Sequence, residues 1–158
     1  MRLAPRPKTR AVLRPTVDAS FEDFLPYLIA RLAHELVVDL VKVLRSEGVN
    51  LVRWRILAVL AMADGITISE ISEGAMMQQS ALSRMLMTME HEGYIVRALR
   101  REDERCVEIF LANKGREAFR ALNAVVRRRE NRLLQGFSRE DTDAAFELVQ
   151  RLRRNIQG

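Results

Sequence analysis

The sequence has little of the chemistry that most catalytic or metal sites need. It contains one cysteine, Cys106, and two histidines, His34 and His91, which lie far apart in the chain. One cysteine excludes an internal disulfide, and the wide spacing of the histidines argues against a zinc site. The sequence shows no phosphate-binding glycine loop and no nucleophile with a base at a recognisable spacing. We therefore predict that the protein is not an enzyme and needs no metal or cofactor.

Long hydrophobic runs and aromatic residues are also scarce. Aromatic residues make up 6% of the sequence, so aliphatic side chains must dominate the core. Asp39 and Lys42 interrupt the richest apolar run, residues 36–44, which falls well short of the roughly 20 residues that cross a bilayer. Basic residues and prolines occupy the first 16 residues, where a secretory signal would have an apolar stretch. We therefore predict a cytoplasmic protein that is not embedded in a membrane.

What is present suits one globular unit with basic extensions. The chain has 158 residues, of which 48% are hydrophobic and 30% charged. Its net charge of +5 is unevenly spread: residues 1–20 hold five basic residues against one acidic, and residues 114–132 hold seven against two. Such segments can bind phosphates, or they can form a solvated arm and a solvated helix face.

The spacing of apolar residues predicts a mainly helical protein. Residues 1–19 lack any periodicity, and we expect a flexible arm there. From Ser20, a predicted cap, apolar residues recur at spacings of three and four to about Ser46, and Gly48 ends this first helix. Its second half is apolar over most of its circumference, so it lies in the core or is covered by a second chain. A second helix should end near Ala63.

The middle of the chain predicts a short helix, a turn and another helix. Thr67 and Glu70 have the spacing of a capping box, which begins a short third helix. A fourth helix should end at Gly93, with these apolar side chains on one side: Met77, Leu82, Met85, Leu86 and Met89. Its opposite side carries Gln79, Ser80, Ser83, Arg84, Met87 and His91.

Two strands and two more helices complete the predicted order. Alternating apolar residues indicate strands at about residues 94–99 and 106–111, separated by six consecutive charged residues. A long helix should then run to about Leu134. The last, amphipathic helix should open with Ser138 as its cap and Asp141 three residues later.

A short helix, a turn and a helix with a polar outward face form the helix-turn-helix arrangement, whose second helix enters the major groove of DNA. A hairpin directly after it is typical of a wing. The charged run, residues 100–105, would then lie in a loop that reaches phosphates or a narrow minor groove. Asp103 can pair with Arg101 or Arg105 and hold that guanidinium group in place. In the alternative interpretation these charges are only solvated.

Residues from about Leu51 to Gly115 resemble the winged-helix core of the MarR (multiple antibiotic resistance regulator) family of bacterial transcription factors. The resemblance rests on five segments in order: WRIL, ISEIS, QQSALSRMLMTMEHEGYIVR, EDER and LANKG. It implies a mainly α fold, a winged helix-turn-helix with a two-strand wing, flanked by long terminal helices that interlock two protomers into a homodimer. The implied boundaries are 1–19 for the arm, 20–50 for the first dimerisation helix, 51–112 for the DNA-binding domain and 113–158 for the C-terminal dimerisation helices.

The resemblance also implies which residues meet DNA, namely Gln78, Gln79, Ser80, Ser83, Arg84, Arg101, Asp103 and Arg105. Arg84 can read guanine bidentately, Gln79 can read adenine, and the serines can bind phosphate or a base. The sequence departs from the family pattern at three positions. Gln78 stands where a serine-like helix cap is common, Met87 replaces a polar outward residue, and Ala112 replaces a threonine.

Four other residues have both a functional and a structural interpretation. Cys106, next to Arg105, would suit a redox switch, but it also suits simple packing in a strand. His34, near Arg31, would suit an anion pocket or a partly buried structural role. Trp54 has the helical spacing of a core residue. Arg31, His34 and Trp54 are our candidates for contact with a small-molecule ligand.

We therefore expect a sequence-specific, homodimeric DNA-binding repressor. It would bind double-stranded DNA at a pseudo-palindromic operator and would be released by a small molecule, for which an aromatic or phenolic compound is the candidate. The alternatives are a winged-helix module that works through protein contacts and a protein that coats DNA without sequence preference.

Overall fold

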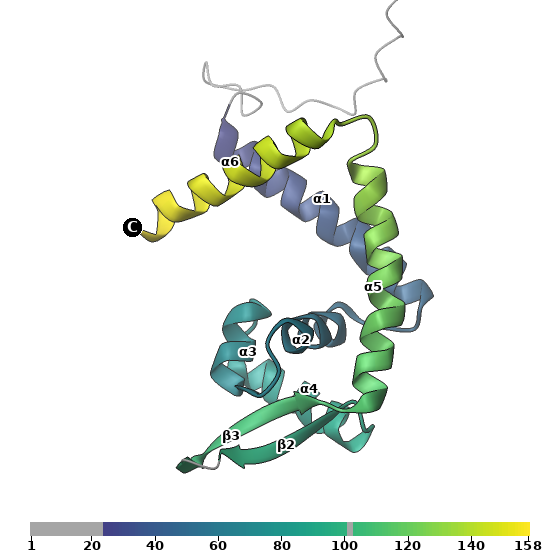
Figure 1. Cartoon of the computed structure of the whole chain (residues 1–158), viewed down its shortest axis with the longest axis vertical. Helices are drawn as coiled ribbons and strands as arrows, with labels where there is room; N and C mark the ends of the chain where they lie inside the picture. Colours follow the sequence, from purple (N-terminus) through teal and green to yellow (C-terminus); the bar gives the residue numbers. More distant parts are fainter. Residues whose placement is uncertain (1–23, 101–102) are drawn as a thin grey trace, which may run out of the picture. The chain divides into compact units, whose positions relative to one another are not determined.

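The computed structural model of the chain describes residues 24–100 and 103–158, with residues 103–105 as strand backbone (Figure 1). Six helices and three strands occur in the order α1 (Leu25–Ser46), α2 (Leu51–Met62), β1 (Ile66–Thr67), α3 (Ile68–Gly74), α4 (Gln79–His91), β2 (Ile95–Arg100), β3 (Asp103–Leu111), α5 (Asn113–Leu133) and α6 (Arg139–Gln157). The predicted mainly α class and the order of the helices are confirmed. The chain divides into two units inside α1, residues 1–38 and residues 39–158.

The described part of the first unit is Phe24 and the N-terminal portion of α1. Its large apolar side chains are exposed in the single chain: Phe24, Leu25, Tyr27, Leu28, Ile29, Leu32, Leu36 and Val38. They recur mostly at spacings of three and four, as predicted. The predicted cap, Ser20, lies outside the described residues. Further along the same helix, Leu44 is buried in the core of the second unit.

The core of the second unit is built around α2. This helix begins at Asn50, whose side chain accepts a hydrogen bond from the backbone amide of Arg53. Ile56, Leu57 and Leu60 are completely buried. The other fully or nearly buried apolar residues come from α2 itself and from α1, α3, α4, β2, β3 and α5: Leu44, Trp54, Ile71, Leu82, Leu86, Met89, Ile95, Ile109, Leu111 and Leu122. Because α2 is apolar on nearly all sides, it is a core helix that the others surround.

The sheet has three antiparallel strands in the order β1-β3-β2. The two-residue strand β1 pairs Ile66 with Ile109 and was not predicted, since two residues are too few to show alternation. The prediction that all six charged residues lie in a loop is wrong. β2 extends to Arg100 and β3 begins at Asp103, and these two residues are paired across the strands. The two strands stay paired beyond their alternating apolar residues, because backbone hydrogen bonds between strands form even where the side chains are exposed to solvent.

Asp64 and Gly65, predicted as a break between helices, also hold the base of the hairpin. The carboxylate of Asp64 accepts one hydrogen bond from the backbone amide of Leu111 at 2.7 Å and one from Arg116 at 2.6 Å. Gly65 has a φ of +75°, and the ring of Phe110 occupies the space that a Cβ would need. This turn therefore ties the end of α2 to β3 and to the start of α5.

Both predicted capping boxes are present. Thr67 and Glu70 exchange hydrogen bonds at the start of α3, and Ser138 and Asp141 do so at the start of α6. The hydrogen bonds from the side chain and backbone of Thr67 lower the pKa of Glu70. Those from Ser138 likewise lower the pKa of Asp141. Both carboxylates are thus held in their charged form, which suits the positive end of a helix dipole.

Among residues 24–100 and 103–158, none of the helices is long and apolar enough to span a bilayer.

Gly115, in the first turn of α5, offers a test of the close packing between the start of α5 and the hairpin. A Cβ at this position would overlap the carbonyl oxygen of Tyr94 and crowd Leu111. We expect Gly115→Ala to lower the free energy of unfolding by about 1–3 kcal/mol, because the helix start must shift. Urea denaturation measures the change. Asn113→Ala, at an exposed position of the same turn, should change stability by less than about 0.5 kcal/mol. Equal stability of Gly115→Ala and the wild type would contradict the close approach of Gly115 to the carbonyl oxygen of Tyr94.

Candidate nucleic-acid interface

The short helix α3 and the helix α4 are joined by a tight turn, residues 75–78. Ser72 closes this turn from both sides: its carbonyl oxygen accepts from the amide of Met77 at 3.0 Å, and its hydroxyl donates to the carbonyl oxygen of Met77. Met76 has a φ of +52°, in the left-handed region that few residues other than glycine adopt. The turn is thus fixed by local hydrogen bonds, which sets the direction in which α4 leaves α3.

Helix α4 buries one face and exposes the other. Leu82, Leu86 and Met89 are completely buried against the core. The side opposite to them carries an exposed stripe at spacings of four, three and four, which we call the outward stripe: Ser80, Arg84, Met87 and His91. Residues at these spacings lie one above another on a helix. The predicted division of this helix is confirmed for Leu82, Met85, Leu86 and Met89, with Ser83 half-buried at the edge of the stripe. The placement of Met77 on this helix is wrong, because Met77 lies in the turn that precedes α4.

Several polar groups next to the outward stripe are already engaged. The side-chain amide nitrogen of Gln79, Nε2, donates to the hydroxyl oxygen of Ser69 in α3 at 2.8 Å. The hydroxyl of Ser83 donates to the carbonyl oxygen of Gln79 at 2.9 Å, and that of Thr88 donates to the carbonyl oxygen of Arg84 at 3.2 Å. These hydrogen bonds point the hydroxyl protons back along the helix.

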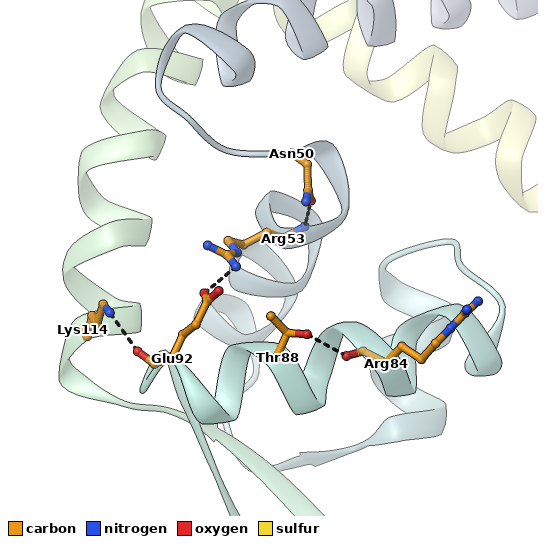
Figure 2. A network of polar contacts seen from close by, with 6 residues as sticks. All are labelled: Asn50, Arg53, Arg84, Thr88, Glu92 and Lys114. Atoms are coloured by element: carbon orange, nitrogen blue, oxygen red, sulfur yellow. Dashed lines mark hydrogen bonds and ion pairs between the residues drawn. The ribbon is translucent and has the colours of Figure 1, made fainter.

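Arg84 differs from these neighbours. Within the part of the chain that the structure describes, its guanidinium group has no hydrogen-bond or ion-pair partner. Figure 2 shows the side chain extended away from α4, with no dashed line at its nitrogen atoms. Five N–H donors in a planar fork are thus available to an anion or to a base edge.

The first turn of α4 has no side-chain cap. Gln78 occupies the cap position with extended backbone, and its side chain makes no capping hydrogen bond. The same holds for Ala112 at the start of α5. Both positions were noted in the sequence as departures from the family pattern, Gln78 from a serine-like cap and Ala112 from a threonine. Backbone amides without a side-chain acceptor at a helix start can donate to phosphate oxygens.

The C-terminal end of α4 is held by charged residues from two other helices (Figure 2). The carboxylate of Glu92 forms an ion pair with Arg53 of α2, and its carbonyl oxygen accepts from Lys114 of α5 at 2.8 Å. Both cations also lie over the ring of Tyr94, Arg53 at 4.9 Å and Lys114 at 4.5 Å from its centre. Sequence reasoning missed this cluster, because Arg53 and Glu92 are 39 residues apart.

The hairpin is attached to α4 and carries its own ion pair. Arg97 of β2 lies 2.9 Å from the carboxylate of Glu90 near the end of α4. Arg100 donates to Glu108 across the hairpin at 2.6 Å, and this hydrogen bond raises the pKa of Arg100. Arg100 is therefore a charged but internally paired member of the charged run.

The other three predicted wing residues lie wholly or partly outside the described residues. Arg101 lies outside the described residues, as do the side chains of Asp103 and Arg105. In Figure 1 the end of β2 and the start of β3 lie far from α5. The proposed pairing of Asp103 with an arginine stays a prediction.

The structure separates the three ligand candidates into a core residue and two surface residues. Trp54 is 8% exposed and stacks on Phe119 with ring centres 5.6 Å apart, as expected of a core residue. Arg31 forms an exposed ion pair with Glu35 at 3.3 Å. His34 is exposed in the single chain, so the expectation of a partly buried histidine is wrong there. In the described segments, no group of three or more His, Cys, Asp or Glu residues is arranged to hold a metal ion.

A short helix, a fixed turn, a helix with an exposed polar stripe and a hairpin attached to its end define a winged helix-turn-helix protein. Residues 49–107 match the model of the MarR family. The chain is 27% identical over 136 residues to the HTH-type transcriptional repressor IacR of Pseudomonas putida, covering 86% of this chain and 77% of that protein. The resemblance seen in the sequence is thus confirmed: residues 49–107 are assigned to a MarR-family domain, and the chain is similar to solved MarR-family transcriptional regulators.

Solved structures agree with this assignment. A MarR-family transcriptional regulator from Silicibacter pomeroyi superposes with a TM-score of 0.78 and 26% identity, covering 90% of this chain and 97% of that one. The transcriptional repressor CouR, solved bound to a 23-mer DNA duplex, superposes with a TM-score of 0.72 and 20% identity over 87% of this chain and 99% of that one. The CouR likeness establishes a shared fold.

The ion pair at the end of α4 can be tested by removing one charge. Glu92→Gln leaves the side chain of Arg53, 18% exposed, without its carboxylate partner. We expect the free energy of unfolding to fall by about 1–2 kcal/mol, since a mostly buried cation loses the negative charge that compensates it. Chemical denaturation measures the change. Glu35→Gln removes the carboxylate of the exposed Arg31 pair and should cost less than about 0.5 kcal/mol. Equal effects of the two substitutions would rule out a special role for Glu92.

Proposed function

We propose that this MarR-family regulator is a homodimeric repressor that binds a pseudo-palindromic operator and is released by a small molecule. The observation that carries the proposal is the outward stripe of α4, near whose centre lies the guanidinium group of Arg84, unpaired among the described residues. A rigid helix that presents a free arginine and small polar groups suits the major groove, where base edges carry distinct donors and acceptors.

In this proposal the residues of α3 and α4 divide the work of binding. Arg84 reads a guanine through its two acceptors, O6 and N7, and Ser80 binds a phosphate or a base. The side-chain amide nitrogen of Gln79 donates to Ser69. This hydrogen bond orients the side-chain carbonyl oxygen, which in this proposal accepts from the N6 amino group of an adenine. Ser83 and the exposed Gln78 contribute at the edges. Arg101, Asp103 and Arg105 form the wing contact, with Asp103 ordering the arginines.

The dimer is proposed from the apolar side chains that a single chain leaves uncovered. The exposed apolar residues of α1 have counterparts in and before α6: Phe137, Phe146, Leu148, Val149 and Ile156. No residue of α6 is buried. Such faces are typical of subunit interfaces. We therefore assign residues 20–50 and 113–158 to dimerisation and 51–112 to DNA binding, with residues 1–19 as a basic arm.

Repression and release complete the proposal. The similarity to IacR, a transcriptional repressor, supports repression over activation. Release requires an effector that binds the DNA-incompetent state better than the DNA-bound state. An aromatic or phenolic acid is our candidate, with Arg31 and His34 as its polar contacts. This part rests on the family relationship, and we place the protein in the cytoplasm on the same ground.

Selection of bound sequences from a random duplex pool tests the function directly. We expect an enriched palindrome with half-sites about one helical turn apart, since a twofold dimer meets the groove twice on one side of the duplex. The affinity for this site should fall by at least about tenfold between roughly 50 and 200 mM salt. Weak, salt-sensitive binding without enrichment would instead indicate a DNA-coating protein. No binding at all would indicate a protein-interaction module.

The assignment of Arg84 and Arg105 has its own test. Alanine at both positions should weaken operator binding by roughly tenfold to a hundredfold, because a base contact and a wing contact are both lost. Arg84→Ala alone should also relax the preference for one base pair in each half-site. Arg139→Ala removes a charge from α6, at a side chain that is 96% exposed, and should change affinity less than about twofold. An unchanged affinity of the double variant would show that the assignment is wrong.

A further inference from the structure

The outward stripe of α4 contains one apolar residue among polar ones. Met87 is 58% exposed and lies one helical turn beyond Arg84, between that arginine and His91. It is absent from the core cluster and from the partly buried residues packed against it. The other two methionines of the helix have structural places: Met89 is completely buried, and Met85 packs against the core. Met87 therefore has no packing role within the described chain.

The neighbours of Met87 leave it prominent on this surface. Thr88 and Ser83 on its two flanks direct their hydroxyl groups back to backbone carbonyl oxygens of the helix. The outward stripe therefore offers the approaching groove a guanidinium group from Arg84 and a thioether from Met87 at adjacent positions. One is a strong hydrogen-bond donor, and the other makes only apolar contacts.

The major groove contains a matching apolar group. Thymine presents a methyl group at C5 in the major groove, and none of the other three bases carries one. A methionine side chain is unbranched, flexible and polarisable, so it can adapt its shape to a methyl group. Three residues along a helix rise about 4.5 Å, which is little more than one base-pair step of about 3.4 Å. A thymine in contact with Met87 would thus lie close to the base that Arg84 contacts.

We propose that Met87 is a specificity-determining residue that contacts the C5-methyl group of a thymine in each half-site. This thymine lies within about one or two base-pair steps of the base that Arg84 reads. The inference rests on the proposed operator binding and adds to it one apolar contact that discriminates thymine from cytosine or uracil. The contact is made by a side chain that neither the core nor the neighbouring hydrogen bonds of the helix require.

The experiment removes only the methyl group. Once selection has given an operator, each thymine is replaced in turn by deoxyuridine, symmetrically in both half-sites, and affinity is measured for the wild type and for Met87→Ala. We expect one deoxyuridine position to weaken wild-type binding by roughly threefold to fivefold per half-site, the effect of about one buried methyl group. The same position should have no effect on Met87→Ala. Thermal unfolding verifies that this exposed substitution leaves the fold intact.

A matched control and the contrary outcomes make the test decisive. Met62→Ala removes a methionine that is 89% exposed at the end of α2, and it should keep the wild-type sensitivity to deoxyuridine. If an operator is found but no deoxyuridine position distinguishes the wild type from Met87→Ala, the inference is overturned while the proposed function stands. Loss of affinity in Met87→Ala without such a position also overturns it. If selection enriches no operator, both fall together.

Discussion

The structure depends first on the burial of α2. Ile56, Leu57 and Leu60 are removed completely from solvent, and the helices and strands of the second unit pack around them. α4 contributes Leu82, Leu86 and Met89 to the same core, so the rotation of this helix about its own axis is set by its apolar side. The direction of Arg84 follows from that rotation, because it stands on the opposite side. The surface that we propose to read DNA is in this sense determined by what the helix buries.

Burial fixes the rotation of α4, and polar contacts fix its ends. Ser72 closes the turn before the helix, and Glu92 joins the end of the helix to Arg53 and Lys114. Lys114 lies in the first turn of α5, within the proposed dimerisation region. A displacement of α5 would therefore move Lys114 and change its contact with the carbonyl oxygen of Glu92 at the end of α4. Such a connection is a physical route by which events at the proposed dimer interface would bias the proposed DNA-binding helix.

Local signals in the sequence predicted most of the fold. Both capping boxes, the division of α4 into two faces and the missing side-chain cap at Gln78 depend on residues within one or two turns, so spacing reveals them. The strand β1, the extension of the hairpin into the charged run and the Arg53–Glu92 pair depend on segments distant in the sequence. Spacing carries no information about such partners. The engagement of Gln79 by Ser69 was missed for the same reason.

Helix α6 buries none of its residues, although its capping box is complete. In proteins, most of the stability of a helix comes from the packing of its apolar face. The order of α6 therefore depends on what covers its exposed apolar residues more than on the core around α2. If a second copy of the chain is that cover, the fraction of molecules with an ordered α6 rises with protein concentration. The amount of regulator in the cell would then control its shape as well as its occupancy of DNA.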